Sequence, residues 1–444
     1  MRSICLFFQV HQPLKHRRYR FFDIGNDHYY YDDYTNETTI KNLAEKSYLP
    51  ANKLLIKLAE QMKEKFKASF SVSGMALDQF ELYAPQVIKS FRELAKTGCI
   101  EFLSETWSHS LSSLKDNTIF EQQVKLHEDR ITNLFGQKPR IFRNTEMIYS
   151  DDIGARVYDM GYKGMLTEGA KHVLGWKSPN FLYVNAVNPR LKVLMRNFKL
   201  SDDISFRFSN SNWSEYPLTA EKFISWLNNL NPREEIVNLF MNYESIGGRQ
   251  PEESGIFDFM ENLIKKIATA KNLKFATPSE VVREVQPMSI VNVPHPVSWA
   301  DEERDLTAWL GNEMQKEAFE KLYSISHRMA NCNNEKLIKE WNYLQTSDHF
   351  YYMSTKLFLG KKNYAYVNPF VSPYEAFINY MNIISDFVTR LNEDMGVLNP
   401  EQKIASLNKL IDEKEKKIKK MEDELIQLKK LKHQKKHQKK RQKR

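Results

Sequence analysis

Short apolar and β-branched runs alternate with amphipathic stretches of helical length over the N-terminal two thirds of the chain. This alternation is typical of βα units arranged around a parallel sheet. The expected strands cover residues 4–10, 68–73, 100–104, 140–144, 164–167, 193–196 and 236–241, with a further short strand at 274–276. Seven or eight units favour a barrel, although periodicity alone also allows an open sheet. The tyrosine-rich residues 21–39 are expected to form a long loop.

The pattern changes to helical spacing after a proline-bearing connector at residues 291–296. Helices are expected at residues 301–326, 335–344, 349–357 and 373–391. The chain is therefore predicted to be an α/β protein in three parts. These are a barrel domain at 1–290, a helical domain packed on the barrel at 291–395, and a tail at 396–444.

The tail carries a heptad-like pattern of apolar residues that predicts a short coiled coil. Its seam residues are Ile404, Leu407, Ile411, Ile418, Met421, Leu425 and Leu428, with Lys414 at one seam position. Such a helix makes self-association plausible, with an unknown number of chains. Residues 433–444 contain no apolar side chain and are expected to be disordered in isolation.

The net charge of +9 is informative only when its distribution along the chain is considered. Residues 401–444 hold 17 Lys or Arg against 7 Asp or Glu, so residues 1–400 carry a net charge of −1. The basic tail could contact nucleic acid or an anionic surface. We favour a solvated coiled coil with a solubilising end over nucleic-acid binding.

Several classes of protein are disfavoured by what the sequence lacks. The apolar run at residues 4–8 is too short for a signal peptide, and no stretch has the length of a membrane helix. Cys5, Cys99 and Cys332 are far apart, which predicts no disulfide framework and favours a cytoplasmic protein. The chain has no glycine-rich phosphate loop, HExxH motif or paired cysteines, so neither a metal nor a cofactor is expected.

Polar clusters follow several of the expected strands. His11 and Gln12 come directly after the first strand, and a later segment delivers Glu101, Trp107 and His109. In a parallel barrel the carboxyl ends of the strands converge on one mouth, so side chains from distant positions can meet there. Each cluster taken alone could equally be a structural turn or core.

Two further clusters hold carboxylates. Arg143 and Glu146 follow the strand at 140–144, and a carboxylate beside an arginine would be held ionised, as a nucleophile must be. An ordinary strand-end salt bridge would give the same pattern. Asn242 and Glu244 follow the strand at 236–241 and would point to the same side if the strand geometry continued.

Taken together and in order, these motifs resemble those of glycoside hydrolase family 57, in particular its α-amylase-like branch. The matching segments are His11-Gln12-Pro13, Gly98 to Glu101 with the His109 region, Arg143 to Glu146, and Asn242 to Gly247. The resemblance covers residues 1 to about 390. It implies an incomplete TIM-like barrel of seven βα units, followed by a helical bundle that helps to close a substrate groove.

The same resemblance implies a retaining hydrolase that acts on α-glucan or malto-oligosaccharide without a metal. Glu146 takes the nucleophile position, and His11, Gln12, Glu101, Trp107, His109 and Arg143 become candidate substrate-binding residues. A general acid and base is expected from the fourth motif. Aromatic side chains, which make up 12% of the chain, could serve as sugar platforms, but none is assigned to a subsite.

The sequence departs from the family at this general acid. Members with a complete site carry Asp where this chain has Asn242, and the branch commonly continues Tyr-Glu-Thr-Phe-Gly-Glu-His. This chain reads Tyr243-Glu244-Ser245-Ile246-Gly247-Gly248-Arg249. An amide has no acidic proton near neutral pH, and general acid and base catalysis is typically worth about 10² to 10⁴ in rate.

Three readings follow from this departure. The chain could be a weak α-glucan hydrolase or transglycosylase, or a degenerate relative that binds glucan without turnover. Glu244 could also stand in for the missing acid. A step of some 6 to 7 Å between alternate strand residues is large against the roughly 5 to 5.5 Å carboxylate separation of retaining enzymes. An inverting arrangement with a wider gap therefore stays open.

Overall fold

The computed structural model describes residues 1–359 and 368–395, together with residues 404, 408, 411, 414–416 and 419. The predicted coiled coil and basic tail, residues 396–444, therefore lie almost wholly outside the described residues. Residues 1–387 form one compact unit, and a second unit begins at Val388. No described helix combines the length and the apolar character that crossing a bilayer requires.

Ten strands and eighteen α-helices occur among the described residues. The strands are β1 (Arg2–Val10), β2 (Ala68–Val72), β3 (Ile100–Phe102), β4 (Ile141–Arg143), β5 (Gly164–Glu168), β6 (Leu182–Asn185), β7 (Lys192–Arg196), β8 (Ile236–Asn242), β9 (Leu273–Phe275) and β10 (Ser289–Val291). The helices of the barrel part are α1 (Asp33–Leu43), α2 (Leu49–Met62), α3 (Gly74–Tyr83), α4 (Pro85–Lys96), α5 (Asn117–Phe135), α6 (Asp151–Asp159), α7 (Lys171–Leu174), α8 (Phe198–Asp202), α9 (Ala220–Asn228), α10 (Ile256–Thr269) and α11 (Pro278–Glu284). The later helices are α12 (Thr307–Leu310), α13 (Glu313–Tyr323), α14 (Ser326–Met329), α15 (Glu335–Leu344), α16 (Ser347–Tyr351), α17 (Thr355–Leu359) and α19 (Pro373–Asp394).

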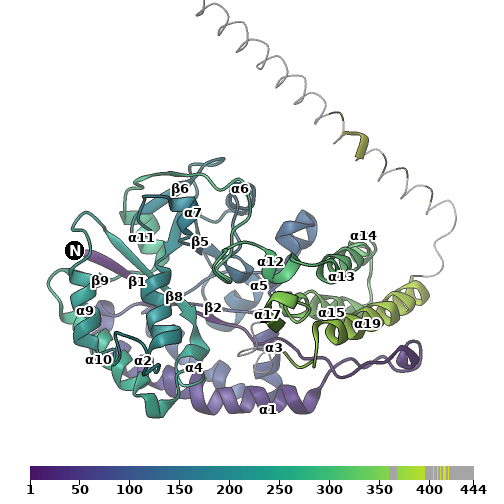
Figure 1. The fold of residues 1–444 in the computed structure, drawn as a ribbon, viewed down its shortest axis with the longest axis horizontal. Helices are drawn as coiled ribbons and strands as arrows, with labels where there is room; N and C mark the ends of the chain where they lie inside the picture. Colours follow the sequence, from purple (N-terminus) through teal and green to yellow (C-terminus); the bar gives the residue numbers. More distant parts are fainter. Residues whose placement is uncertain are drawn as a thin grey trace, which may run out of the picture. The chain divides into compact units, whose positions relative to one another are not determined.

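Two sheets join to form the barrel (Figure 1). One has the order β3-β2-β1-β8, with β9 beside the start of β1, and the other has the order β10-β6-β7-β5-β4. A parallel bridge between Ser104 and Phe142 links β3 to β4, and the Asn197 N–H donates to the Asn238 carbonyl between β7 and β8. The strands β1, β2, β3, β4, β5, β7 and β8 therefore follow one another around a ring, while β6 pairs antiparallel to β7 outside it.

Side chains alternate between the two faces of the ring. On β1, Leu6 and Phe8 pack in a large core with α2, α4 and α10 on the outside. Phe7 packs instead with Phe240 of β8 in a second core on the inside, with ring centroids 5.5 Å apart. This period of two fixes which strand residues can reach the barrel interior.

The later helices contact the barrel part at several points within the first unit, and one of them lies next to His109. Ser110 and Thr346 form an antiparallel bridge, and the Ser347 N–H donates to the His109 carbonyl at 2.9 Å. Since Ser347 begins α16, this contact brings the helical region to the segment that carries His109. In Figure 1 these helices are drawn in green, from α12 to α17.

The predicted barrel strands are confirmed at all seven ring positions, and β9 matches the expected strand at 274–276. The loop prediction for residues 21–39 is wrong in its second half, because Asp32 caps α1 by accepting from the Thr35 N–H. The expected helix at 301–326 is interrupted: α12 ends at Leu310, and Asn312 caps a new helix. The short strands β6 and β10 were not expected.

Candidate active site

Glu146 lies at the mouth of the barrel, just after β4. It sits in a single 3₁₀ turn, Thr145–Met147, and its backbone is left-handed, with φ 53° and ψ 27°. His109 and Met147 also have positive φ values, of 53° and 56°. Such conformations are uncommon for residues other than glycine and cluster at functional sites.

Both carboxylate oxygens of Glu146 are held by donors. The imidazole Nε2 of His109 lies 2.8 Å from Oε1, and the indole Nε1 of Trp299 donates to Oε2 at 2.6 Å. Burial would raise the pKa of Glu146, but the hydrogen bonds from His109 and Trp299 outweigh it and lower the pKa. The carboxylate is thereby kept ionised and fixed in orientation, while its side chain remains 20% exposed.

A fully buried ion pair contacts the ring nitrogen of His109 that does not face Glu146. Nη1 of Arg143 donates to Oε2 of Glu105 at 3.0 Å, and the same oxygen lies 3.0 Å from Nδ1 of His109. Burial acts to raise the pKa of Glu105, yet Arg143 and His109 lower it to about 2. Burial also opposes protonation of His109, but its bonds to Glu105 and Glu146 raise its pKa. His109 therefore presents a proton to Glu146 from a ring that Glu105 orients.

The helical region supplies a further carboxylate. Asp348, on α16, accepts from Nε2 of His11 at 2.8 Å and from the Thr346 hydroxyl at 3.0 Å. Nδ1 of His11 lies 2.8 Å from the Ser73 hydroxyl, and its ring stacks on His109 with centroids 4.0 Å apart. His11 thus connects the end of β1 to both the helical region and the His109 cluster.

Trp299 reaches Glu146 from the segment between the barrel and the later helices. Reciprocal backbone hydrogen bonds join Tyr149 and Val297 beside the site, and the Trp299 N–H donates to the Glu146 carbonyl at 3.2 Å. The guanidinium of Arg304 contacts the Trp299 carbonyl. These contacts make Trp299 part of the wall that holds the nucleophile candidate.

Asn242 ends β8 on the inner face of the barrel. It pairs in register with Gln9 of β1, and it shares the parity of the inward-facing Phe240. The Nε2 of Gln9 lies 3.5 Å from Nε2 of His109, which in turn contacts Glu146. Asn242 is therefore placed on the same mouth as Glu146. Its buried Oδ1 has no hydrogen-bond partner among the described residues.

Glu244 lies in the 3₁₀ turn Tyr243–Ser245, and its side chain is held by residues from two other segments of the chain. The Tyr48 hydroxyl contacts its Oε1, and Nε2 of Gln12 donates to the same atom at 3.4 Å. Burial raises the pKa of Glu244 against these two donors. Gln12 is thus a neighbour of Glu244, and its own carbonyl accepts from Gln79 at 2.8 Å.

Two predicted site residues make their side-chain contacts outside the Glu146 cluster. Glu101 sits within β3, before the carboxyl end of that strand, and its carboxylate accepts from the N–H and hydroxyl of Ser279 rather than joining the cluster. Trp107 is 8% exposed and packs so closely on Gly74 that a Cβ there would approach its ring to 2.2 Å. A substrate-binding role for Trp107 stays a prediction.

The structure brings together His11, His109, Arg143 and Glu146 among the predicted residues, and it adds Glu105, Trp299 and Asp348. A strand-end pattern could have revealed Glu105, because it lies just beyond β3. Trp299 and Asp348 follow no strand of the barrel. Only the folded chain shows that they reach the same mouth.

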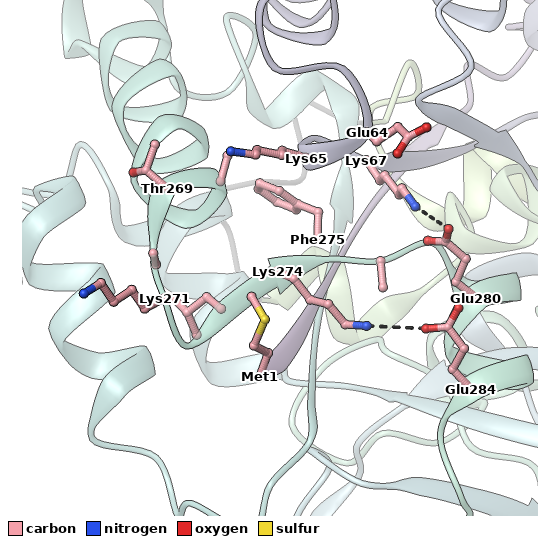
Figure 2. A pocket seen from close by; sticks show the side chains of 14 residues that line it. Met1, Glu64, Lys65, Lys67, Thr269, Lys271, Lys274, Phe275, Glu280 and Glu284 are labelled. Atoms are coloured by element: carbon pink, nitrogen blue, oxygen red, sulfur yellow. Dashed lines mark hydrogen bonds and ion pairs between the residues drawn. The ribbon is translucent and has the colours of Figure 1, made fainter.

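Within residues 1–359 and 368–395, no group of three or more His, Cys, Asp or Glu residues could hold a metal ion. A cavity of about 680 Å³ opens near the start of β1 and β9, at the other end of the barrel (Figure 2). Met1, Lys65 and Lys271 line it, and Lys274 pairs with Glu284 at 3.4 Å. None of the candidate site residues contributes to this cavity.

A parallel barrel with an ionised carboxylate fixed at its mouth is typical of enzymes that use a carboxylate nucleophile. The model of glycosyl hydrolase family 57 matches residues 5–294, and the chain belongs to that family. It is 37% identical over 400 residues to a Methanocaldococcus jannaschii protein named "Putative alpha-amylase", covering 87% of this chain and 84% of the relative.

Solved structures share the fold at low sequence identity. The branching enzyme of this family from Thermococcus kodakaraensis, solved with glucose, superimposes with a TM-score of 0.64 at 13% identity, covering 88% of this chain and 94% of that one. An alpha-amylase from Thermotoga maritima superimposes with a TM-score of 0.58 at 12% identity, covering 90% and 95%. These matches confirm the predicted fold of an incomplete barrel with a helical domain.

Proposed function

We propose that this chain acts on α-glucan by a retaining mechanism, with Glu146 as the nucleophile and Asn242 at the position of the general acid and base. The observation that carries the proposal is the Glu146 carboxylate, kept ionised by His109 and Trp299. The substrate class comes from the family, whose relatives include proteins named as an alpha-amylase and a branching enzyme.

In the first half of the reaction, a Glu146 oxygen attacks the anomeric carbon, and the bond to the departing glycosidic oxygen breaks. That oxygen leaves with an electron pair and needs a proton if it belongs to a sugar. In the second half, water attacks the glucosyl ester and must lose a proton. Asn242 can supply neither proton transfer, because its amide does not titrate near neutral pH. We therefore expect slow turnover of ordinary glucan.

Glu244 is the remaining candidate for a substitute acid. Burial raises its pKa, which favours the protonated form that an acid needs. The contacts from Tyr48 and Gln12, however, both engage Oε1 and tie the side chain to two other segments of the chain. Glu244→Gln tests the idea: it should lower glucan turnover if Glu244 donates the proton, and leave it unchanged if the acid is absent.

A glucan-binding protein without turnover is the second candidate function, and the amide at Asn242 is the observation that favours it. Asn242→Asp separates the two candidates. An intact site should gain about 10² to 10⁴ in malto-oligosaccharide hydrolysis, because general acid and base catalysis has that typical value. The double variant Glu146→Gln with Asn242→Asp should lose the gain. Continued inactivity of Asn242→Asp, with glucan affinity retained, would favour the binding function.

Self-association through the tail, and its contact with nucleic acid or an anionic surface, stay predictions. Truncation after Pro400 should leave glucan affinity unchanged and reduce any self-association. Retention of nucleic acid by the full chain at low salt, lost at moderate salt and in the truncated form, would overturn our preference for a solvated coiled coil.

A further inference from the structure

Two charged residues that the proposed displacement does not use face the barrel interior beside Trp299. Glu168 ends β5 and Arg196 ends β7, and the two residues are paired in register. Each follows an inward-facing leucine, Leu166 or Leu194, by two positions, so both side chains also point into the barrel. Glu168 is fully buried and Arg196 is 3% exposed. A buried ion pair therefore lies at the strand ends that form the mouth.

Every nitrogen of the Arg196 guanidinium has an acceptor. Nε donates to the Phe240 carbonyl of β8 at 2.7 Å, and Nη1 donates to the Glu168 carboxylate at 3.0 Å. Nη2 contacts the carboxylate of Asp202 on α8. Because a guanidinium is planar, bonds at all three nitrogens fix both its position and its tilt. Arg196 thus forms a rigid surface that joins β5, β7 and β8.

The Trp299 indole packs against this surface. The Arg196 Cζ lies over the indole ring, 5.6 Å from its centre, and the Cζ of Arg143 lies 6.0 Å from the same ring. Cations within about 6 Å of an aromatic face are attracted to it, and tryptophan attracts them most strongly. Two buried arginines therefore determine where the indole lies.

The loop that carries Trp299 is fastened to the same ion pair. The Arg304 guanidinium contacts the Trp299 carbonyl, and its Nη1 lies 3.5 Å from the Glu168 carboxylate. The loop closes where the Ser298 N–H donates to the Arg304 carbonyl at 3.1 Å. Arg304 itself has a left-handed φ of 53°, a conformation that persists where surrounding contacts determine it. Ring and loop are thus held by one network.

We infer that Arg196 is a positioning residue, which holds the Trp299 indole in the orientation that lets it donate to Glu146. This inference rests on the proposed nucleophile. The indole Nε1 lies 2.6 Å from the Glu146 carboxylate, and such a bond weakens steeply as its angle departs from linear. A small rotation of the ring is therefore enough to weaken it. Through the Phe240 carbonyl, Arg196 also ties this ring to the strand that ends at Asn242.

The pH dependence of Glu146 labelling by an activated glucosyl fluoride tests this inference on the full chain. Arg196→Met should slow labelling by as much as about 100-fold, the loss that a misplacement of about 1 Å can cause. It should also move the acid limb to higher pH, because the Trp299 bond helps to lower the pKa of Glu146. Arg196→Lys should restore labelling only in part, since an ammonium lacks the planar fork. Full rescue by lysine would mean that charge alone acts, and would overturn the inference.

Two comparisons separate positioning from general stabilisation. In the Trp299→Phe background, Arg196→Met should move the acid limb no further, because the donor that Arg196 holds is already gone. Arg2→Met is the matched control. Arg2 is 8% exposed, and at the other end of the barrel it donates to the carbonyls of Asn231 and Glu234 at 2.8 and 3.0 Å. An equal shift in the Trp299→Phe background, or in Arg2→Met, would overturn the inference.

A second readout needs neither turnover nor labelling. The chain has seven tryptophans, and Trp299→Phe identifies the Trp299 signal in a spectrum of ¹⁵N-labelled indoles. That signal should titrate with pH, and Glu146→Gln should abolish the titration. The double variant Arg196→Met with Glu168→Gln removes the ion pair as a whole, so that no buried charge is left alone. It should shift the Trp299 signal, whereas Arg2→Met should not.

These measurements distinguish the failure of this inference from the failure of the proposed function. If Glu146 is labelled but the Trp299 signal and the acid limb do not respond to Arg196, the inference is wrong and the nucleophile assignment stands. If the Trp299 signal responds to Arg196 but the natural chain is not labelled, the positioning of the indole stands and the proposed function is wrong.

Discussion

The end of β4 and the end of β8 face the same barrel mouth but differ in how their polar groups are satisfied. On the β4 side, His109 and Trp299 hold both oxygens of Glu146. On the β8 side, the Asn242 oxygen is buried without a partner among the described residues. A buried polar atom without a partner costs free energy, so it usually marks a place that a ligand or water fills.

The difference shows that the nucleophile candidate and the position of the general acid and base are supported by separate sets of contacts. The wall that carries Glu146 is built from barrel strands and is braced by the buried pair of Arg143 and Glu105. The wall that carries Asn242 is a strand end followed by a loop, so a substitution at Asn242 removes no such brace.

The largest expected effect concerns the ion pair of Arg143 and Glu105, both of which are fully buried. Arg143→Met leaves the Glu105 carboxylate without its cation, and breaking a buried pair in this way typically costs about 3 to 5 kcal/mol. Urea unfolding would measure the loss in the free energy of unfolding. The double variant with Glu105→Gln should be less destabilised than the single one. Equal or greater destabilisation of the double variant would mean that Arg143 stabilises the fold by some other contact.

The next effect concerns His109, which donates to Glu146. His109→Phe removes this donor from the reacting carboxylate, and the loss of one preorganised donor typically costs about 10² to 10³ in rate. The rate of Glu146 labelling by an activated glucosyl fluoride would measure it. His109→Gln keeps an N–H donor, so its rate of Glu146 labelling should fall less than that of His109→Phe. Equal losses in the two variants would argue that the imidazole acts by more than donation.

A smaller effect is expected at Trp299. Trp299→Phe keeps a ring but removes the N–H that donates to Oε2, and one lost hydrogen bond to a charged group costs about 1.5 to 3 kcal/mol. Glu146 must be ionised to react, and its lowered pKa preserves activity above that pKa and loses it as the pH falls through it. The variant should therefore move the acid limb of kcat/KM to higher pH. Trp226→Phe, on α9, is the matched control and should leave the profile in place.

The strands of the barrel could be predicted from the sequence better than the shorter elements around them. The seven ring strands could be predicted because most of them are rich in apolar residues, as is usual for parallel strands that are buried on both faces. The strands β6 and β10 were not predicted, and they lie outside the regular alternation of the ring, with β6 antiparallel to β7 and β10 beside β6. The helix α1 was not predicted because most of its residues are polar and give it no clear apolar face.

Site residues could be predicted only where a polar side chain comes directly after a strand. Glu146 and Asn242 lie where strand ends place them, whereas Glu101 lies within β3 and its carboxylate turns to Ser279. Trp299 and Asp348 lie more than 150 residues from Glu146, and no local pattern ties them to it. Long-range packing determines these contacts, so they could not be read from spacing.

The most direct test of the account is to trap the glucosyl unit on the protein. A fluorinated α-glucosyl fluoride needs no acid to leave, so the natural chain should form a covalent adduct despite the amide at Asn242. Digestion and mass spectrometry should find one glucosyl unit on Glu146 and none in Glu146→Gln. An adduct on a different carboxylate, such as Glu244 or Asp348, or no adduct at all, would contradict the assignment of Glu146 as the nucleophile.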